Sequence, residues 1–189
     1  MDADLLRQKF EAGQTWSDYL ATGEPDQQAD WQRIYDQAAL TPEQTALLEG
    51  FVRQFHVLVL SGIWCGDCVQ QVPLIQRIAE AGGDRIAVRY LDRDAHEALQ
   101  AEVSINGGHR VPVVIFAAED FEPVGWFGDR TLNRYRALAQ RQLGASCPLP
   151  GAPVDDDELA VTLSDWVDQF ERVHLLLRLS GRLREKHGD

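Results

Sequence analysis

SGIWCGDCVQQVP, residues 61–73, holds two of the three cysteines of the chain, Cys65 and Cys68. It joins a short apolar run (56–63), which predicts a buried strand, to a segment with helical spacing (68–82). A cysteine at a helix N-terminus lies beside free N–H groups and the positive end of the helix dipole, and both favour its thiolate. Cys68 lies about one turn further along the same face. The stretch therefore predicts a two-step disulfide exchange, in which Cys65 attacks and Cys68 resolves the mixed disulfide.

The chain that follows predicts alternating strands and helices. Strands are expected at residues 56–63, 85–92, 111–118 and 122–128, and helices at residues 68–82, 95–105 and 129–144. The first two strands alternate with helices, whereas the last two are close enough in sequence to form a hairpin. We therefore expect an α/β domain with a central mixed β-sheet flanked by helices. Asp129 is the candidate N-cap of the last helix.

A helical extension precedes this domain. Residues 1–50 repeat aromatic and apolar residues at helical spacing, and these side chains are expected to pack this segment onto the domain, with a binding surface as the alternative. Thr41, Pro42 and Gln44 predict a helix start with a capping box. The sequence thus divides into an N-terminal helical extension (1–50) and a domain at residues 51–145.

A second extension, residues 146–189, continues from a linker rich in proline, glycine and aspartate into one helix. The helix carries an apolar stripe made of Leu159, Leu163, Trp166, Phe170, Val173 and Leu177. We expect this stripe to dock on the chain's own core, and a homodimer through the C-terminal helix is the alternative.

Composition and charge limit the functions that the chain can have. The formal net charge is −12, which argues against nucleic acid and anionic membranes as partners. No run of 18 apolar residues is present, and the first residues lack the apolar core of a secretory signal. We therefore expect no membrane segment and a cytoplasmic location, where thiols stay reduced.

Metal binding is the main rival explanation for the cysteine pair. A structural zinc site usually has four ligands, often two such pairs. Here one pair is accompanied only by Cys147 and five scattered histidines. We therefore expect no metal and no other cofactor, and we expect Cys147 to be a free thiol without a part in turnover. An incidental buried pair is the second rival, and the junction of strand and helix argues against it.

Residues 64–68, WCGDC, resemble the WCGPC motif of the thioredoxin family, and Trp64, Gly66 and both cysteines match it. Pro73 stands where thioredoxins place the proline that kinks the active-site helix. The resemblance covers roughly residues 51–142. It implies a thioredoxin-like fold, here with N- and C-terminal helical extensions, and thiol–disulfide chemistry.

Two later stretches extend the resemblance, RVPVVIF (110–116) and VGWFGDRTLNRY (124–135). The first resembles the thioredoxin strand that begins with a cis-proline, and the second resembles the last strand, glycine and final helix of that family. The resemblance implies that Pro112 is cis and that the Val111 peptide lies against the Cys65 sulfur.

The sequence departs from the family at positions that matter for proton transfer. Val59 and Val88 stand where thioredoxins carry a buried aspartate and its lysine, which help to move the proton of the resolving thiol. Asp67 replaces the proline between the cysteines. Its charge is expected to raise the Cys65 pKa, and a role as proton acceptor for Cys68 is the alternative.

Arg110, just before the cis-proline position, is a candidate to offset the charge of Asp67 or to hold an acidic group of a substrate. The alternative is that His109 and Arg110 are solvated side chains on a loop.

These observations predict a thiol–disulfide oxidoreductase, a cytoplasmic disulfide reductase that acts through Cys65 and Cys68. Its partners would be a disulfide-containing protein or small-thiol substrate and a reductant, with no nucleic acid and no membrane. The alternative is a thioredoxin-like protein-interaction module with weak or no redox turnover. The intact Trp64, Cys65, Cys68 and Pro112 favour the oxidoreductase, whereas the missing buried charges and the large extensions keep the alternative open.

Overall fold

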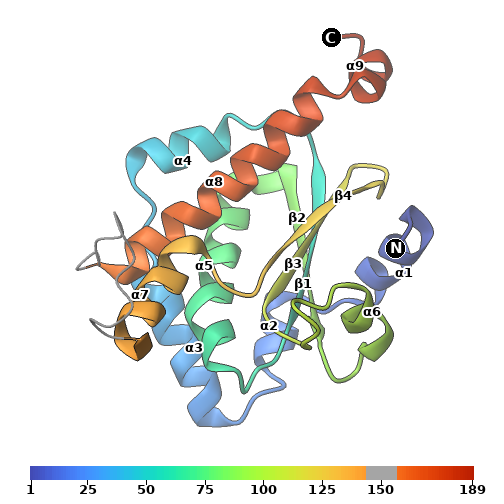
Figure 1. Ribbon diagram of the computed structural model, residues 1–189. Coiled ribbons are helices and arrows are strands. Elements are labelled where there is room, and N and C mark those ends of the chain that lie inside the picture. The colour runs from blue at the N-terminus through green and yellow to red at the C-terminus, as the bar shows by residue number, and fades with distance from the viewer. Residues whose placement is uncertain (144–156) are drawn as a thin grey trace.

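The computed structural model describes residues 1–143 and 157–189 (Figure 1). Within them, a mixed sheet has the strand order β2-β1-β3-β4, where β1 is parallel to β2 and antiparallel to β3, and β4 is antiparallel to β3. The strands are β1 (Phe55–Ser61), β2 (Ile86–Asp92), β3 (Val113–Ala118) and β4 (Pro123–Gly128). The predicted mixed sheet and its hairpin of the last two strands are confirmed.

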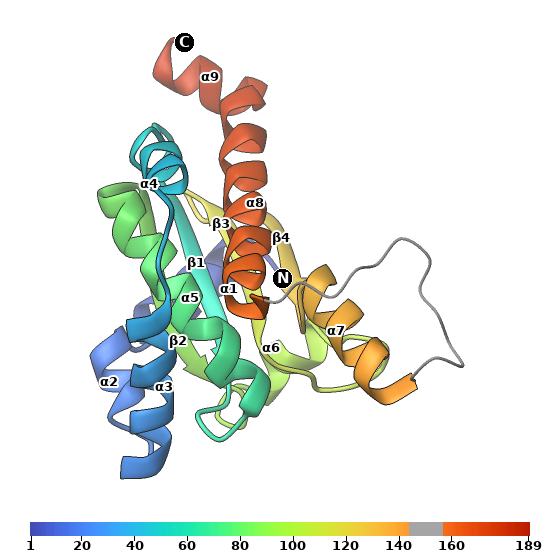
Figure 2. The same ribbon diagram turned by 90° about the vertical axis from the view of Figure 1, so that its left-hand side faces the viewer.

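Helices cover both faces of the sheet. They are α1 (Ala3–Ala12), α2 (Trp16–Leu20), α3 (Pro25–Gln37), α4 (Pro42–Glu49), α5 (Gly66–Gly82), the short 3₁₀ helix η1 (Gly83–Arg85), α6 (Glu97–Glu102), α7 (Leu132–Leu143), α8 (Glu158–Leu179) and α9 (Gly181–His187). Figures 1 and 2 show α3, α4, α5 and α8 on one side of the sheet and α1 and α6 on the other.

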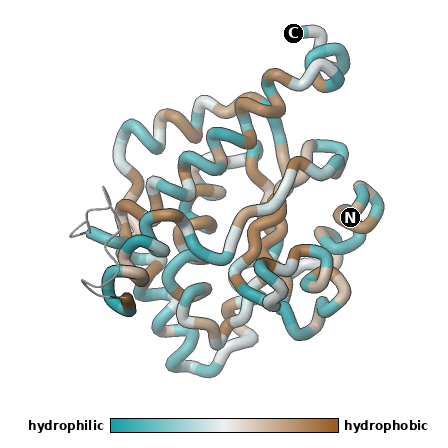
Figure 3. The backbone as a smooth tube through the Cα atoms, viewed as in Figure 1, coloured by the Kyte–Doolittle hydropathy of each residue, from teal (hydrophilic) through white to brown (hydrophobic). Residues whose placement is uncertain are grey.

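Strand β1 contributes to two cores because its side chains alternate between the faces of the sheet. Val57 and Val59 face the core under α5, and Leu58 and Leu60 face the core under α1 and α6. The central strands form a hydrophobic layer between the helices (Figure 3). A strand covered on both faces is apolar throughout, which explains the uninterrupted apolar run in the sequence.

The N-terminal extension packs onto the domain, as expected. Tyr19 and Trp31 are fully buried, and Trp31 Nε1 donates a hydrogen bond to the Ile63 carbonyl at 2.9 Å. The predicted capping box is also confirmed, because Thr41 and Gln44 exchange side-chain and backbone hydrogen bonds at the start of α4. The hydrogen bond to Ile63 ties the extension to the loop that leads into the cysteine pair.

Helix α8 docks on the chain's own core, as expected. Leu163, Trp166 and Phe170 are buried in the same core as α5, and the rest of the stripe follows them. The stripe is therefore not free to form a dimer seam. Since side chains of both extensions share this core with the sheet, the three parts of the sequence are segments of one packed unit.

Two sequence-based boundaries need correction. The helix expected at residues 95–105 is limited to α6, and Asp129 does not cap α7, which begins at Leu132. Asp129 is instead buried and bound by tertiary contacts, and the Thr131 hydroxyl accepts from the Arg134 N–H at 3.5 Å.

The prediction for Cys147 falls outside the described residues. Among the described helices, none combines the length and the apolar character needed to cross a membrane.

Candidate active site

The two cysteines lie at the start of α5, in different environments. Cys65 is the N-cap of the helix and is partly exposed, whereas Cys68, in the first turn, is fully buried. The Cys65 N–H donates to the Gly62 carbonyl at 2.9 Å, which closes the turn between β1 and α5. Both cysteines are free thiols. The local fold thus gives the two thiols the unequal accessibility that the sequence predicts.

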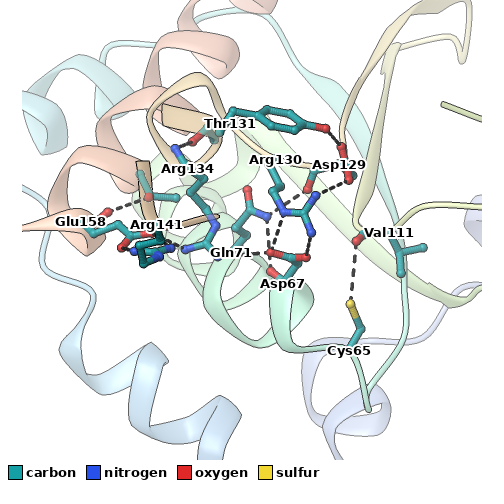
Figure 4. Close-up of polar contacts among 12 residues, drawn as sticks. Cys65, Asp67, Gln71, Val111, Asp129, Arg130, Thr131, Arg134, Arg141 and Glu158 are labelled. Carbon is teal, nitrogen blue, oxygen red and sulfur yellow. Dashed lines mark hydrogen bonds and ion pairs between the residues drawn. The ribbon is translucent and has the colours of Figure 1, made fainter. Parts of the chain in front are cut away.

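The loop before β3 faces the accessible thiol. The Val111–Pro112 peptide bond is cis, as the resemblance implied, and the Cys65 thiol lies 3.8 Å from the Val111 carbonyl oxygen (Figure 4). The end of β4 approaches the same loop closely: a Cβ atom at Gly128 would lie 2.4 Å from the Pro112 carbonyl oxygen. A residue with a side chain at position 128 would push this loop away from Cys65.

The pKa values of the two thiols move in opposite directions. A hydrogen bond from the Cys68 side chain lowers the pKa of Cys65 to about 6, against the effect of burial, and the backbone N–H groups of Cys68 and Asp67 add to the lowering. Burial raises the pKa of Cys68 well above its ordinary value, and the neighbouring Cys65 raises it further. At neutral pH the accessible sulfur is the thiolate and the buried sulfur keeps its proton.

Two arginines form ion pairs with the Asp67 carboxylate and offset part of its negative charge. Arg130 pairs with both carboxylate oxygens, through Nε at 3.0 Å and through Nη2, and Arg134 Nη2 donates to Oδ1 at 3.2 Å (Figure 4). The Asp67 charge still acts to raise the Cys65 pKa, but the lowering effects outweigh it. The expected direction of the Asp67 effect on the Cys65 pKa is therefore confirmed, although the net shift of that pKa is downward.

Arg110 does not pair with Asp67, so the first of its two expected roles, offsetting the Asp67 charge, is wrong. Its Nη1 donates to Asp129 Oδ2 at 3.2 Å, and its side chain is nearly half exposed. His109 is also exposed. Arg110 thus lies at the rim of the site, bound to a different carboxylate from the one expected.

Asp129 forms hydrogen bonds with side chains from several segments around the site. Its buried carboxylate accepts hydrogen bonds from Arg110, from Arg130 at 2.9 Å and from the Tyr135 hydroxyl. Although burial acts in the opposite direction, the hydrogen bonds from Tyr135 and Arg110 hold the pKa of Asp129 below its ordinary value. Gln71 on α5 donates to the Asp129 carbonyl at 3.0 Å. These contacts fix the segment after β4 against the first turns of α5.

Sequence reasoning missed Arg130, Arg134 and Gln71 as parts of the site. The resemblance of residues 124–135 to the last strand, glycine and final helix of thioredoxins was the available signal for the two arginines, and Gln71 lies on the helix predicted after the cysteines. The network continues beyond the site, because Arg134 Nη1 donates to Glu158 at 3.0 Å on α8 (Figure 4).

Trp64 and Gly66 frame the accessible thiol. Trp64 is half exposed, and the Arg93 guanidinium lies 4.6 Å from the centre of its ring. Gly66 is exposed, with open space where a side chain would be. The approach to Cys65 therefore stays open on one side and is lined by an aromatic ring on the other.

Val59 and Val88 are buried in the apolar core, so neither position carries a group that takes up or releases protons. Within residues 1–143 and 157–189, no cluster of three or more His, Cys, Asp or Glu side chains is arranged to hold a metal ion.

The sheet, the cysteine pair at a helix start and the cis-proline loop define a thioredoxin-like protein. A family model described as thioredoxin matches residues 13–140, and the chain belongs to this family. A search of the curated proteins finds no match. The match begins inside the N-terminal extension, at the segment that precedes α2.

Two solved structures share the fold along most of the chain. One is a protein of unknown function from Pseudomonas aeruginosa, with 17% sequence identity, a TM-score of 0.68 and coverage of 87% of this chain and 93% of that chain. The other is an HIV epitope scaffold, with 17% identity, a TM-score of 0.60 and coverage of 92% and 93%. Coverage this large includes terminal helices as well as the sheet.

Proposed function

We propose that the chain is a thiol–disulfide oxidoreductase that reduces a disulfide of a protein or small-thiol substrate through Cys65 and Cys68. The proposal is carried by one observation. A partly exposed thiol with a lowered pKa lies at the start of α5, beside a fully buried thiol with a raised pKa. This pair supports a nucleophile and a resolving thiol with separate roles.

In the first step the Cys65 thiolate attacks one sulfur of the substrate disulfide. A bond forms between Cys65 and that sulfur, the substrate S–S bond breaks, and the other sulfur leaves as a thiolate that takes a proton from water. The Val111 carbonyl oxygen lies 3.8 Å from the Cys65 sulfur, so the loop before β3 would border a substrate bound there.

In the second step Cys68 loses its proton to solvent and attacks the Cys65 sulfur. The Cys65–Cys68 bond forms, the bond to the substrate breaks, and the second substrate sulfur leaves and is protonated. Two electrons pass from the dithiol to the substrate, so an external dithiol reductant has to restore the reduced pair. A reducing compartment such as the cytoplasm suits this direction of electron flow.

The experiment follows reduction of insulin disulfides by dithiothreitol in the presence of the purified protein. We expect Cys65→Ser to abolish the acceleration and Cys68→Ser to accumulate mixed disulfides, while the control variant Cys147→Ser keeps the activity. A redox titration should give a reversible two-electron couple between about −270 and −120 mV. Wild-type activity that survives in Cys65→Ser, or a chain without a reversible couple, would overturn the proposal.

A protein-interaction module remains the second candidate, because Val59 and Val88 leave the site without its family's buried charges. This role predicts partner binding that does not need the thiols. Binding of the same partners by the double variant Cys65→Ser/Cys68→Ser, together with absent insulin reduction by the wild type, would favour it.

A further inference from the structure

A pair of buried hydroxyls lies behind the resolving thiol. Tyr19 comes from α2 in the N-terminal extension, and Ser61 is the last residue of β1. Both side chains and Cys68 are fully buried. The Ser61 hydroxyl lies next to the Tyr19 hydroxyl and next to the Cys68 thiol. Tyr19, from a distant part of the chain, therefore meets the Ser61 hydroxyl and the Cys68 thiol in an otherwise apolar core.

Neither hydroxyl completes a hydrogen bond of good geometry within the described part of the chain. A buried hydroxyl without a partner costs free energy, so two of them side by side need an explanation. The carboxylate of Asp92 acts on Tyr19 only through its charge and forms no hydrogen bond with either hydroxyl, and its Oδ1 accepts from the backbone N–H groups of Asp94 and Ala95. The remaining polar neighbour is the sulfur of Cys68.

We propose that Ser61 donates a hydrogen bond to the Cys68 sulfur when this thiol ionises, and that Tyr19 positions the Ser61 hydroxyl for this contact. The inference rests on the proposed function and concerns its second step. In this state both orphaned hydroxyls gain a partner: Tyr19 donates to Ser61, and Ser61 donates to the thiolate. The backbone N–H of Gly62 acts on the same sulfur in the same direction.

The hydroxyls act as donors and not as bases. Burial raises the pKa of Tyr19, so its proton stays in place at neutral pH. The proton of Cys68 passes to solvent, the Cys68 sulfur bonds to the Cys65 sulfur as the Cys65–substrate bond breaks, and the departing substrate sulfur is protonated in turn. Cys65 is the other titratable group that faces Cys68, and it carries no charge once it is part of the mixed disulfide. Stabilisation of the Cys68 thiolate by neutral donors replaces the proton acceptor that Val59 does not provide.

The test separates the two chemical steps in a Cys147→Ser background. Tyr19→Phe removes the hydroxyl and keeps the ring, which stacks on Tyr90 and meets Trp31 edge-on. Ser61→Ala removes the second hydroxyl. The protein is converted to the mixed disulfide between Cys65 and 2-nitro-5-thiobenzoate, and release of the yellow thiolate is followed in single turnovers from pH 5.5 to 9.

We expect Ser61→Ala to slow release about tenfold at pH 7, the size of one hydrogen bond to a charged group, and to move its pH midpoint upward. Tyr19→Phe should act in the same direction with a smaller effect, and alkylation of Cys65 should keep its rate in both variants. Tyr35→Phe is the matched control, because its hydroxyl binds Glu80 at 2.9 Å, away from the thiols.

Release at the wild-type rate and pH midpoint in folded Tyr19→Phe would overturn the inference, as would an equal slowing by Tyr35→Phe. If Ser61→Ala does not fold, Tyr19→Phe alone decides. A wild-type protein that forms the mixed disulfide but never releases the thiolate would instead overturn the proposed function itself.

Discussion

The different chemistry of Cys65 and Cys68 follows from a separation of three residues along one helix. The first lies outside the first turn, where N–H groups point at its sulfur and one side is open. The second lies inside the turn, covered by the sheet and the N-terminal extension. Burial penalises a thiolate and N–H donors stabilise it, so the same residue type has opposite pKa shifts at the two positions.

Limiting alkylation of the reduced protein tests this difference. The rate of Cys65 labelling should rise with pH around a midpoint of about 6, because the thiolate is the reactive form. Cys68 should stay unlabelled until the protein unfolds. Peptide mapping after reaction with iodoacetamide measures both. Preferential labelling of Cys68, or a midpoint near the ordinary cysteine value of about 8.5, would contradict the assignment.

Asp67→Asn tests the balance between repulsion and pairing. Loss of the charge should lower the Cys65 pKa only modestly, because Arg130 and Arg134 already neutralise the carboxylate. The same change takes one of two carboxylate partners from each of two mostly buried guanidiniums, so that Arg130 keeps only Asp129 and Arg134 keeps only Glu158, and we expect about 1–3 kcal/mol less stability. Thiolate absorbance against pH and urea unfolding measure the two effects.

The control for this variant is Asp30→Asn, which breaks an exposed ion pair with Arg33 and should change stability by less than about 0.5 kcal/mol. An Asp67→Asn protein as stable as the wild type would show that the arginine pairing is unimportant, and a rise in the Cys65 pKa would contradict the assigned direction.

At the residue scale, the sequence was sufficient to predict the reactive cysteine pair, but it was insufficient to predict which charged residues surround the pair. The spacing of Cys65 and Cys68 is local and readable, whereas the pairing of Asp67 with Arg130 joins residues 63 apart. Arg110 precedes the cis-proline and Arg130 follows β4, and only the folded arrangement of these two loops decides which arginine reaches Asp67. The position of the Tyr19 hydroxyl behind Cys68 depends on the same kind of long-range packing.

At the scale of the elements, the starts of helices were predictable where local capping decides them. Thr41 and Gln44 cap α4 through contacts within one turn. Asp129 is the counterexample: its residue type and position favour a cap, but Arg110, Arg130 and Tyr135 bind its carboxylate. When tertiary contacts bind the side chain of a potential capping residue, the local sequence gives no sign of it.

Helix α8 makes a large energetic contribution because it covers a face of the core. Phe170 is fully buried, with its ring edge-on to Phe116 at 5.2 Å and near Phe55. We expect Phe170→Ala to lower the free energy of unfolding by about 3–5 kcal/mol. Urea unfolding followed by tryptophan fluorescence measures the change.

The matched control is Leu176→Ala, on the same helix but with a side chain that is 41% exposed, which should cost less than about 1 kcal/mol. Equal costs for the two variants would mean that α8 is not docked as described. The burial of Leu163, Trp166 and Phe170 in the chain's own core accounts for the apolar stripe in the sequence.

At the scale of the whole molecule, the extensions and the sheet form one packed unit. The main core contains Tyr19 and Trp31 from the N-terminal extension, Val59 from the sheet, and Trp166 from α8. Sequence patterns identified each segment, since periodicity is a local property. How the segments share one core is a property of the folded chain, and it places Tyr19 next to the dithiol.

The reactive thiol also links redox state, pH and global stability. The Cys65 pKa is about 6 in the folded protein and about 8.5 in an unfolded chain. Because the folded value is the lower one, the thiolate stabilises the reduced fold fully above pH 8.5, and this contribution disappears as the pH falls through 6.

We therefore expect the stability advantage of reduced wild type over reduced Cys65→Ser to grow between pH 6 and 8.5. Cys65 is partly exposed, so solvent screening limits the increase to about 1–2 kcal/mol. Urea unfolding at a series of pH values, with both proteins kept reduced, measures it. The oxidised wild type is the control, because a disulfide has no thiolate and should show no such rise. An advantage that stays constant or shrinks with rising pH would mean that the fold does not favour the Cys65 thiolate, and the nucleophile would then have to be sought elsewhere in the chain.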